Sequence, residues 1–178
     1  MERKYFTFVL SLSFLFLLYS SSFVFGEESE VKKELWENGE KRLEEYYKGG
    51  KLDGLSTYFY ENGVKMFEVY YKQGKKNGLK THWYPDGKAW YERNYKFGKK
   101  DGLWTEWYEN GKKWWEKHYK YGEPDGVWTE WHENGQKSLE AHYKNGELDG
   151  LWTEWDEDGN KTSEIEYKND DEVSRKEF

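Results

Sequence analysis

Cysteine is absent from the 178-residue sequence, which excludes disulfide bonds, thiolate metal sites and lipid attachment at a cysteine. Folding and function therefore do not depend on the redox state of the compartment. The sequence also lacks a paired nucleophile and base, a phosphate-binding loop and the ligand spacing of a metal site. We therefore expect a protein that is not an enzyme, with no catalytic residue, no cofactor and no metal ion.

Basic side chains are too few to balance the acidic ones. The chain has 28 lysines and arginines against 35 aspartates and glutamates, which gives a net charge of −7. Phosphate backbones attract basic surfaces, so this balance argues against nucleic acid as a partner. It argues equally against anionic membrane lipid, and we expect a soluble acidic protein.

The first 26 residues differ from the rest of the chain. A short charged start precedes an uncharged run rich in Phe, Leu and Val, from Tyr5 to Tyr19, and Val24-Phe25-Gly26 offers small or branched residues to a signal peptidase. We predict a cleaved signal peptide over residues 1–26 and a secreted or periplasmic, cell-envelope location. The alternative is an uncleaved N-terminal membrane anchor, because residues 6–25 reach the ~20 residues that a span needs. Cleavage before Glu27 leaves 26 basic and 34 acidic side chains, a net charge of −8.

Glycines recur with a period of 24 residues, without insertion or deletion between the units. Three series keep this period: Gly39, Gly63, Gly87, Gly111, Gly135 and Gly159; Gly50, Gly74, Gly98, Gly122 and Gly146; and Gly54, Gly78, Gly102, Gly126 and Gly150. A fixed period of this length is the signature of a repeat architecture. A residue that recurs in every unit serves the architecture, so function has to be sought in the residues that vary between units.

Within each unit, apolar residues recur at every second position, which is typical of a strand with one buried face. In one unit these residues are Leu103, Thr105 and Trp107. The segment Glu109-Asn110-Gly111 is typical of a tight hairpin turn with its glycine in the left-handed conformation, and a second turn spans Gly98 to Gly102. We predict an all-β fold: an elongated antiparallel meander of 24-residue β-hairpin repeats, with about 12 strands in a single layer, flat or curled.

The domain boundaries follow from where the repeat pattern begins and ends. Residues 27–168 are predicted to form one repeat domain, with five full units and a half-unit cap at each end. Residues 169–178 are predicted to be a charged C-terminal tail that breaks the pattern. No interior linker is visible, so the chain after residue 26 is expected to be one domain.

The turns also predict which residues share a face of the sheet. A three-residue Glu-Asn-Gly loop, and a second turn centred on the residue before Asp101, would place Leu103, Thr105 and Trp107 on one face with Tyr119. We predict this face to be the core. Its large aromatic residues are Trp83, Trp107, Trp131, Trp155, Tyr71, Tyr95, Tyr119 and Tyr143.

The repeated glutamates and the four histidines fall on the opposite, outward face in this register. These residues are Glu44, Glu68, Glu92, Glu116, Glu140 and Glu164, with His82, His118, His132 and His142. Neighbouring lysines can screen the glutamates, so we predict solvated charges rather than paired acid–base groups. His118 and His142 would lie two strands apart, ~9.6 Å, too far to bind one metal ion directly.

Five tryptophans vary between units and are predicted to project from the outward face. They are Trp90, Trp104, Trp114, Trp128 and Trp152, whereas the first two units hold Arg42, Met66, Ser56 and Lys80 at these positions. An exposed aromatic cluster on a soluble protein suggests a binding patch. The alternative is packing, either because the sheet curls or because a second copy covers the rings. The oligomeric state does not follow from the sequence.

The unit from Tyr143 to Gly159 resembles a MORN-type repeat, and more closely its bacterial variant, through its Tyr-Lys-x-Gly and Asp-Gly-Leu-Trp segments and the Glu-Asn-Gly of other units. The resemblance covers about residues 31–168 and carries no catalytic residue. Proteins similar to this variant are often labelled antitoxin components, and eukaryotic relatives are associated with membrane attachment and scaffolding. The resemblance implies an interaction protein whose partner would be a toxin, and the predicted signal peptide implies that this protein is exported. The alternative is a glycan or cell-wall binding module that uses the outward tryptophans.

Overall fold

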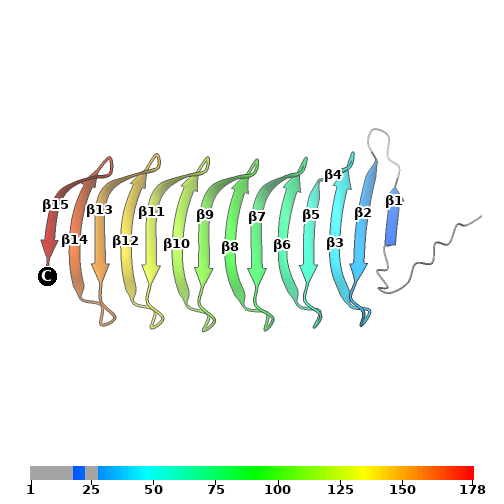
Figure 1. The fold of residues 1–178 in the computed structure, drawn as a ribbon, viewed down its shortest axis with the longest axis horizontal. Helices are drawn as coiled ribbons and strands as arrows, with labels where there is room; N and C mark the ends of the chain where they lie inside the picture. Colours follow the sequence, from blue (N-terminus) through cyan, green and yellow to red (C-terminus); the bar gives the residue numbers. More distant parts are fainter. Residues whose placement is uncertain (1–17, 23–27) are drawn as a thin grey trace, which may run out of the picture.

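The chain folds into one antiparallel β-sheet, a single open layer in which the strands follow one another in sequence order (Figure 1). The computed structural model describes residues 18–22 and 28–178. Within these residues each strand pairs with its neighbours along the chain, except that the short β4 pairs only with β3. The predicted all-β meander of repeated hairpins is confirmed.

The described residues contain 15 strands, more than the predicted 12 or so. The strands are β1 (Leu18–Ser22), β2 (Ser29–Leu35), β3 (Lys41–Lys48), β4 (Lys51–Leu52), β5 (Gly54–Phe59), β6 (Lys65–Lys72), β7 (Lys75–Trp83), β8 (Ala89–Lys96), β9 (Lys99–Trp107), β10 (Lys113–Lys120), β11 (Glu123–Trp131), β12 (Lys137–Lys144), β13 (Glu147–Trp155), β14 (Lys161–Lys168) and β15 (Asp171–Glu177). The surplus arises because β4 is separate from β5 and because strands form at both ends.

Both ends of the array differ from the sequence prediction. The charged tail, expected to break the pattern, continues the sheet as β15, which pairs with β14 from Ser163↔Glu177 to Lys168↔Asp171. At the other end β1 pairs with β2. The rest of the predicted signal peptide, and its cleavage point before Glu27, lie outside the described residues. The described part of the chain contains no helix long and apolar enough to cross a membrane.

Each unit has a first strand, such as β8, and a second strand, such as β9. One kind of turn joins the two through a loop of two residues. In the turn between β8 and β9, Lys96 pairs with Lys99, and the intervening Phe97 and Gly98 have φ angles of 49° and 86°. Positive φ at both central residues is the type I′ turn, whose twist matches that of the strands. The residue before the glycine therefore has to adopt a left-handed conformation even when it is not glycine or asparagine.

This turn leads to a stability prediction at Tyr121, which has a φ of 54° and is 63% exposed. Asparagine tolerates the left-handed region better than tyrosine, and Asn145 fills the equivalent position in the next unit with a φ of 50°. We expect Tyr121→Asn to raise the free energy of unfolding by about 0.5 kcal/mol and Asn145→Tyr to lower it by a similar amount. Urea denaturation of the two variants checks this; a loss of stability in Tyr121→Asn would contradict the turn assignment.

The second kind of turn is the predicted three-residue Glu-Asn-Gly loop, and it is confirmed. Between β9 and β10 the Gly111 N–H donates to the Tyr108 carbonyl at 2.9 Å, and Gly111 has a φ of 83°. The Asn110 carboxamide accepts a hydrogen bond from the Lys112 N–H at 2.8 Å and donates to the Glu133 carbonyl of the next unit at 3.2 Å. Asn38, Asn62 and Asn134 make the same bond, so in these four units the loop asparagine ties its loop to the next along the edge of the sheet.

Irregular pairing after each turn changes the register from the predicted one. Lys113 faces Trp107, but Trp115 faces Glu106, so Trp114 is an extra residue in β10. Beyond this bulge Lys117 pairs with Trp104, not with Leu103. The predicted register pairing is therefore wrong, and one inserted residue reverses which side chains share a face.

The other irregularity explains one of the glycine series. Tyr95 pairs with Lys100 and Arg93 with Trp104, so β9 has two more residues than β8 in this interval. The same shift recurs between β10 and β11, where a Cβ built on Gly126 would lie 3.1 Å from the His118 Cβ. Gly126 also has a φ of 115°, so both the close approach and the backbone angle favour glycine at this position.

The observed pairing defines two faces. The Trp–Tyr face carries one unbroken cross-strand row: Ser56, Val69, Lys80, Arg93, Trp104, Lys117, Trp128, Ala141, Trp152, Ile165 and Arg175. Tyr71, Tyr95, Tyr119, Tyr143 and Tyr167 lie on the same face, each paired with a glycine. The Thr–Glu face carries the opposite set: Leu79, Leu103, Val127 and Leu151, the threonines such as Thr105, the paired glutamates such as Glu116, and Trp83, Trp107, Trp131 and Trp155.

The core lies on the Trp–Tyr face, which contradicts the predicted assignment of faces. All of the buried apolar residues described belong to that face: Leu43, Val69, Tyr91, Trp104, Ala141 and Ile165. On the Thr–Glu face Thr81, Thr105 and Thr153 are buried, but Leu79, Val127 and Leu151 are exposed. The tyrosines predicted in the core are on the core face, half-buried, whereas the predicted core tryptophans, Trp107 and its equivalents, lie on the other face.

Candidate interaction surfaces

Trp104 and Trp128, predicted as binding residues, belong to a ladder of stacked rings on the Trp–Tyr face. Trp104 lies between Tyr95 and Tyr119, with ring centroids 5.3 and 5.1 Å away. Trp128 continues the ladder, 5.6 Å from Tyr119 and 4.3 Å from Tyr143. Such tilted aromatic pairs stabilise a fold beyond the area they bury, so the ladder holds neighbouring units together.

Trp104 is the most enclosed of the predicted binding residues, with 7% of its surface exposed. Its indole N–H donates to the Asn94 carbonyl at 2.8 Å. The guanidinium of Arg93 and the ammonium of Lys100 lie over its ring, 4.9 and 4.6 Å from the centroid. The prediction that Trp104 projects outward is therefore wrong, because neighbouring side chains from the same face cover its ring.

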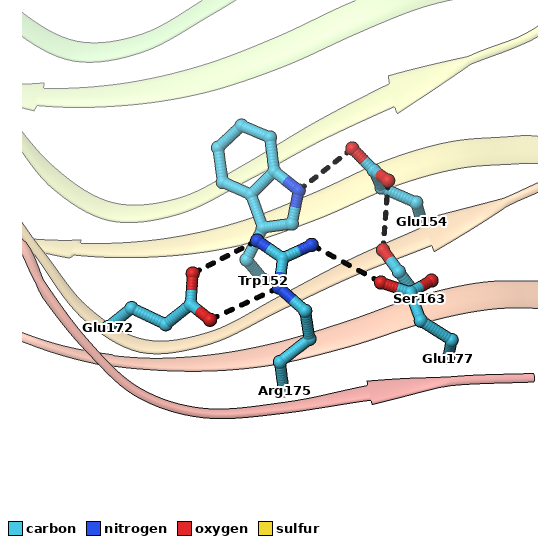
Figure 2. A network of polar contacts seen from close by, with 6 residues as sticks. All are labelled: Trp152, Glu154, Ser163, Glu172, Arg175 and Glu177. Atoms are coloured by element: carbon cyan, nitrogen blue, oxygen red, sulfur yellow. Dashed lines mark hydrogen bonds and ion pairs between the residues drawn. The ribbon is translucent and has the colours of Figure 1, made fainter.

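Carboxylates on the Trp–Tyr face accept hydrogen bonds that fix the tryptophans and arginines. Glu106, which is buried, accepts from the Trp90 indole and from the Arg93 guanidinium, each at 3.1 Å. In the last unit, Glu154 accepts from the Trp152 indole at 3.0 Å and from the Ser163 hydroxyl at 2.8 Å (Figure 2). These carboxylates are occupied by structural partners.

Arg175 extends the polar network onto the terminal strand β15. Its guanidinium donates to Glu172 at 2.9 Å and to Glu177 at 3.2 Å, both carboxylates of its own strand (Figure 2). All residues of β15 are exposed. A charged, exposed edge strand with its side chains paired along the strand discourages addition of a further strand.

The Thr–Glu face exposes an apolar row, whose Leu and Val members were predicted to lie in the core. The exposed members are Tyr46 (40%), Tyr70 (53%), Leu79 (42%), Val127 (37%) and Leu151 (42%). Val127 pairs with His142, and Leu103, half-buried, pairs with His118. The row repeats once per unit from β3 to β13, with Asn94, His118 and His142 between its apolar members, and we call it the apolar strip.

Ion pairs flank the apolar strip on the same face. The Lys113 ammonium lies 2.6 Å from the Glu116 carboxylate and 5.6 Å from the centre of the Trp131 ring. Equivalent pairs are Lys41–Glu44, Lys65–Glu68, Lys137–Glu140 and Lys161–Glu164. The prediction that lysines screen these glutamates is confirmed, although the glutamates share a face with the threonines rather than opposing them.

The prediction that all four histidines lie on one face is wrong. His82 lies on the Trp–Tyr face, with its ring 4.9 Å from Trp90 and 5.0 Å from Tyr91. His118 pairs with Leu103 on the Thr–Glu face, and its Nδ1 lies 3.0 Å from the Val127 carbonyl. Within residues 18–22 and 28–178, no three His, Asp or Glu side chains converge as a metal site would require.

His82 makes stability depend on pH. Both of its ring nitrogens are buried without a hydrogen-bond partner. Burial, followed by the charges of Lys80 and Arg93, lowers the pKa of His82 below its usual value. The unfolded chain therefore binds this proton at a higher pH than the folded chain does, so stability falls as the pH drops below about 6.5.

We expect His82→Tyr, which copies Tyr58 of the preceding unit, to remove part of this pH dependence. The native chain should lose more stability than the variant between pH 7 and pH 5, because only the native chain has this imidazole to protonate. Urea denaturation at the two pH values measures the difference, with His142→Tyr as the control. Identical losses in the native chain and in His82→Tyr would show that another group is responsible.

Trp90 and Trp114 line a hollow near the Glu-Asn-Gly edge of the sheet. The hollow has a volume of about 530 Å³, and its lining includes Tyr84, Tyr108, Glu109 and Glu133. Tyr84 stacks on Trp90 with centroids 5.5 Å apart, and Tyr108 lies 5.7 Å from Trp114. Trp114 is 42% exposed. Of the five tryptophans predicted to form a binding surface, these two meet in one site, away from the ladder that includes Trp104 and Trp128.

Two features were not predicted from the sequence: the exposed apolar strip and the grouping of Trp90 and Trp114 at the hollow. Both depend on the irregular pairing at Trp114 and at the equivalent Trp90, which changes which side chains share a face. One signal was present in the sequence: the residues three before and three after the turn glycine are both aromatic in only two units, Tyr84 with Trp90 and Tyr108 with Trp114.

Comparison with known families agrees with the repeat structure. A family model described as the MORN repeat variant matches five successive segments: residues 52–73, 76–97, 100–121, 124–145 and 148–169. Each segment begins in a second strand and ends in the turn after the next first strand. A search of curated proteins finds no match to this chain. Since the five segments together span more than half of the sequence, the chain belongs to the MORN repeat variant family.

Proposed function

We propose that this chain is a non-enzymatic interaction protein that binds a protein partner through the Thr–Glu face. Repeats of this family generally mediate contacts with proteins or membranes. The observation that carries the proposal is the apolar strip, in which Tyr70, Leu79 and Leu151 each expose more than two fifths of their surface. An exposed apolar row that alternates with Asn94, His118 and His142 and is flanked by ion pairs has the composition of a protein interface.

The electrostatic balance favours a protein over the other macromolecules. The net charge of −7 disfavours nucleic acid and anionic lipid as partners. The core face is covered by its own ladder and by Arg93, Lys100 and Lys117, so it offers less apolar surface. The resemblance to antitoxin components suggests a toxin as the partner, which this chain would neutralise outside the cytoplasm.

Affinity capture tests the proposal. Native cells and their medium are extracted, and tagged protein is compared with a Leu79→Lys/Leu151→Lys variant that places two charges on the strip. We expect the native chain to retain a protein that the variant loses by at least tenfold, with both unfolding at the same urea concentration. Phe97→Lys is the control, because Phe97 is apolar and even more exposed than Leu79 and Leu151 but lies in a turn. Equal retention by all three proteins would contradict the proposed face.

The export proposal has its own test. The signal peptide predicts a mature N-terminus at Glu27 and a loss of the strand pairing between β1 and β2. Mass spectrometry of protein recovered outside the cytoplasm measures the N-terminus directly. Recovery of a chain that still begins at Met1 would contradict cleavage and favour the membrane-anchor alternative.

A glycan or cell-wall polymer is the second candidate ligand. It is favoured by the exposed Trp114 ring, which stands beside the polar side chains of Glu109 and Asn110 in the hollow. Sugars stack on such rings and hydrogen-bond to adjacent carboxylates and amides. Titration of envelope polysaccharide against tryptophan fluorescence, with Trp114→Ala as the control, tests this candidate. A spectral shift that persists in Trp114→Ala would place any glycan elsewhere.

A further inference from the structure

The hollow beside Trp90 and Trp114 combines aromatic rings with carboxylates that lack a cation. Its two ring pairs, Tyr84 with Trp90 and Tyr108 with Trp114, come from successive units. The carboxylates of Glu109 and Glu133 form no ion pair within residues 18–22 and 28–178. Two nearby lysines are engaged elsewhere at the rim: Lys88 binds Asp86 and the Glu109 carbonyl, and Lys112 binds the Asn134 carbonyl.

Elsewhere this chain places its own cations in the same chemical setting. The Arg93 guanidinium lies 3.9 Å from the centre of the Tyr91 ring and forms an ion pair with Glu106. Lys117 lies 4.7 Å from the centre of the Trp128 ring and 2.9 Å from a Glu130 oxygen. A cation between an aromatic ring and a carboxylate is therefore a recurrent stabilising unit of this sheet.

The first unit shows what occupies the position equivalent to Trp90 and Trp114. Three residues before its turn glycine stands Trp36, and three residues after stands Arg42, whose guanidinium lies 5.0 Å from the centre of the Trp36 ring. The same guanidinium is 3.8 Å from Glu34. In the two units that form the hollow, Trp90 and Trp114 replace this arginine. Each unit therefore has two aromatic rings at this place and no cation from this position.

Carboxylates beside the hollow act on both of its tyrosine hydroxyls. Burial raises the pKa of Tyr84, and the charges of Glu109 and Glu106 raise it further. Burial likewise raises the pKa of Tyr108, together with the charges of Glu133 and Glu130. A positive charge entering the hollow would therefore be attracted by the carboxylates and by the ring faces.

We propose that the hollow between the Tyr84–Trp90 and Tyr108–Trp114 ring pairs binds an arginine or lysine side chain of the partner protein. The guanidinium or ammonium stacks on the exposed Trp114 ring and pairs with Glu109 or Glu133, as Arg42 does with Trp36 and Glu34. This inference rests on the proposed function as a protein-binding module and adds a basic segment to the chemistry of the partner. The indole N–H of Trp114 has no partner among the described residues and is left to bond with that segment.

The test uses a synthetic peptide, acetyl-Gly-Arg-Gly-Arg-Gly-amide, and its neutral analogue with citrulline in place of arginine. Indole N–H resonances of the full chain are followed by NMR and assigned by single Trp→Phe variants. We expect the arginine peptide to shift the Trp90 and Trp114 resonances with a dissociation constant on the order of 1 mM. The citrulline peptide should shift them little, and the Trp36 and Trp155 resonances should not move.

Matched variants distinguish binding of the peptide at the hollow from nonspecific attraction to the negative charge of the protein. Glu109→Gln/Glu133→Gln should weaken binding at least fivefold, whereas Glu61→Gln/Glu157→Gln, which changes the equivalent loop glutamates outside the hollow, should not. Equal weakening by both pairs, or equal binding of the citrulline peptide, would overturn the inference. Shifts of the same resonances by cellohexaose but not by the arginine peptide would also overturn it, in favour of a glycan.

The outcome can be separated from that of the proposed function. Leu79 and Leu151 do not line the hollow, so partner capture that depends on them without any arginine-peptide binding would refute the basic segment alone. Peptide binding at the hollow, combined with capture that is indifferent to Leu79 and Leu151, would refute the Thr–Glu face and leave the hollow as the contact. Loss of capture in Glu109→Gln/Glu133→Gln is expected if both proposals hold.

Discussion

Trp104→Ala is expected to lower the free energy of unfolding by about 3–4 kcal/mol, the range for truncating a buried tryptophan. The side chain is 7% exposed, and its indole donates a hydrogen bond to the Asn94 carbonyl. Its removal also breaks the ladder between Tyr95 and Tyr119 and takes away one of the two rings that Arg93 covers. Equilibrium urea denaturation measures the loss, which is a large share of the 5–15 kcal/mol typical of a domain.

Trp107→Ala is the matched control, three residues away on the opposite face. Trp107 is half-buried. In the preceding unit the Lys65 ammonium lies over the equivalent ring, Trp83, whereas the residue equivalent to Lys65 beside Trp107 is Ala89. We therefore expect a loss of about 1–2 kcal/mol. A larger loss from Trp107→Ala than from Trp104→Ala would restore the face assignment predicted from the sequence and contradict the observed register.

Deletion of residues 87–110 is expected to leave a folded protein, whereas deletion of residues 87–98 should abolish cooperative unfolding. The longer deletion removes β8 and β9 and joins Asp86 to Gly111, which restores a loop of the same length. Strand β7 can then pair with β10 as β9 does, because Thr81↔Glu92 and Thr105↔Glu116 are equivalent pairs. Since each unit contacts mainly its neighbours, we expect a melting temperature only a few degrees lower.

The shorter deletion removes β8 alone and joins β7 directly to β9. These two strands run in the same direction, so the shortened chain cannot continue an antiparallel meander, and we expect exposed edges and aggregation. Thermal unfolding followed by circular dichroism, with sedimentation to detect aggregates, compares the two proteins. Similar melting curves for both deletions would show that the structural unit is not 24 residues.

The fold class was predictable because every level of the sequence agrees on it. The 24-residue period, the alternation through Leu103, Thr105 and Trp107, and the loop at Gly111 all indicate antiparallel hairpins. The end strands were less predictable, because β15 is built from the charged segment Asp171–Glu177, which has little apolar alternation. Its pairing follows from the Asn169-Asp170 turn, whose φ angles of 50° and 67° copy the type I′ turns of the other units.

Which residues share a face of the sheet could not be predicted, because this depends on whether an odd or an even number of extra residues is inserted in one strand of each pair. One bulge residue, Trp114, converts pairing of Thr105 with Trp115 into pairing with Glu116, so the face that carries Tyr119 also carries Trp104 instead of Trp107. Nothing in the local composition distinguishes the two registers, because both faces carry tryptophan. Trp104 was therefore assigned to a binding surface although it is buried, while the exposed Leu79 was assigned to the core.

Cysteine cross-linking tests this register most directly, because the native chain has no cysteine to interfere. Leu103 pairs with His118, whereas Lys117 pairs with Trp104 and points to the other face. We predict that Leu103→Cys/His118→Cys forms an intramolecular disulfide readily under mild oxidation, and that Leu103→Cys/Lys117→Cys does not. Faster cross-linking of the second pair, in protein with unchanged urea denaturation, would contradict the face assignment on which both proposed binding surfaces depend.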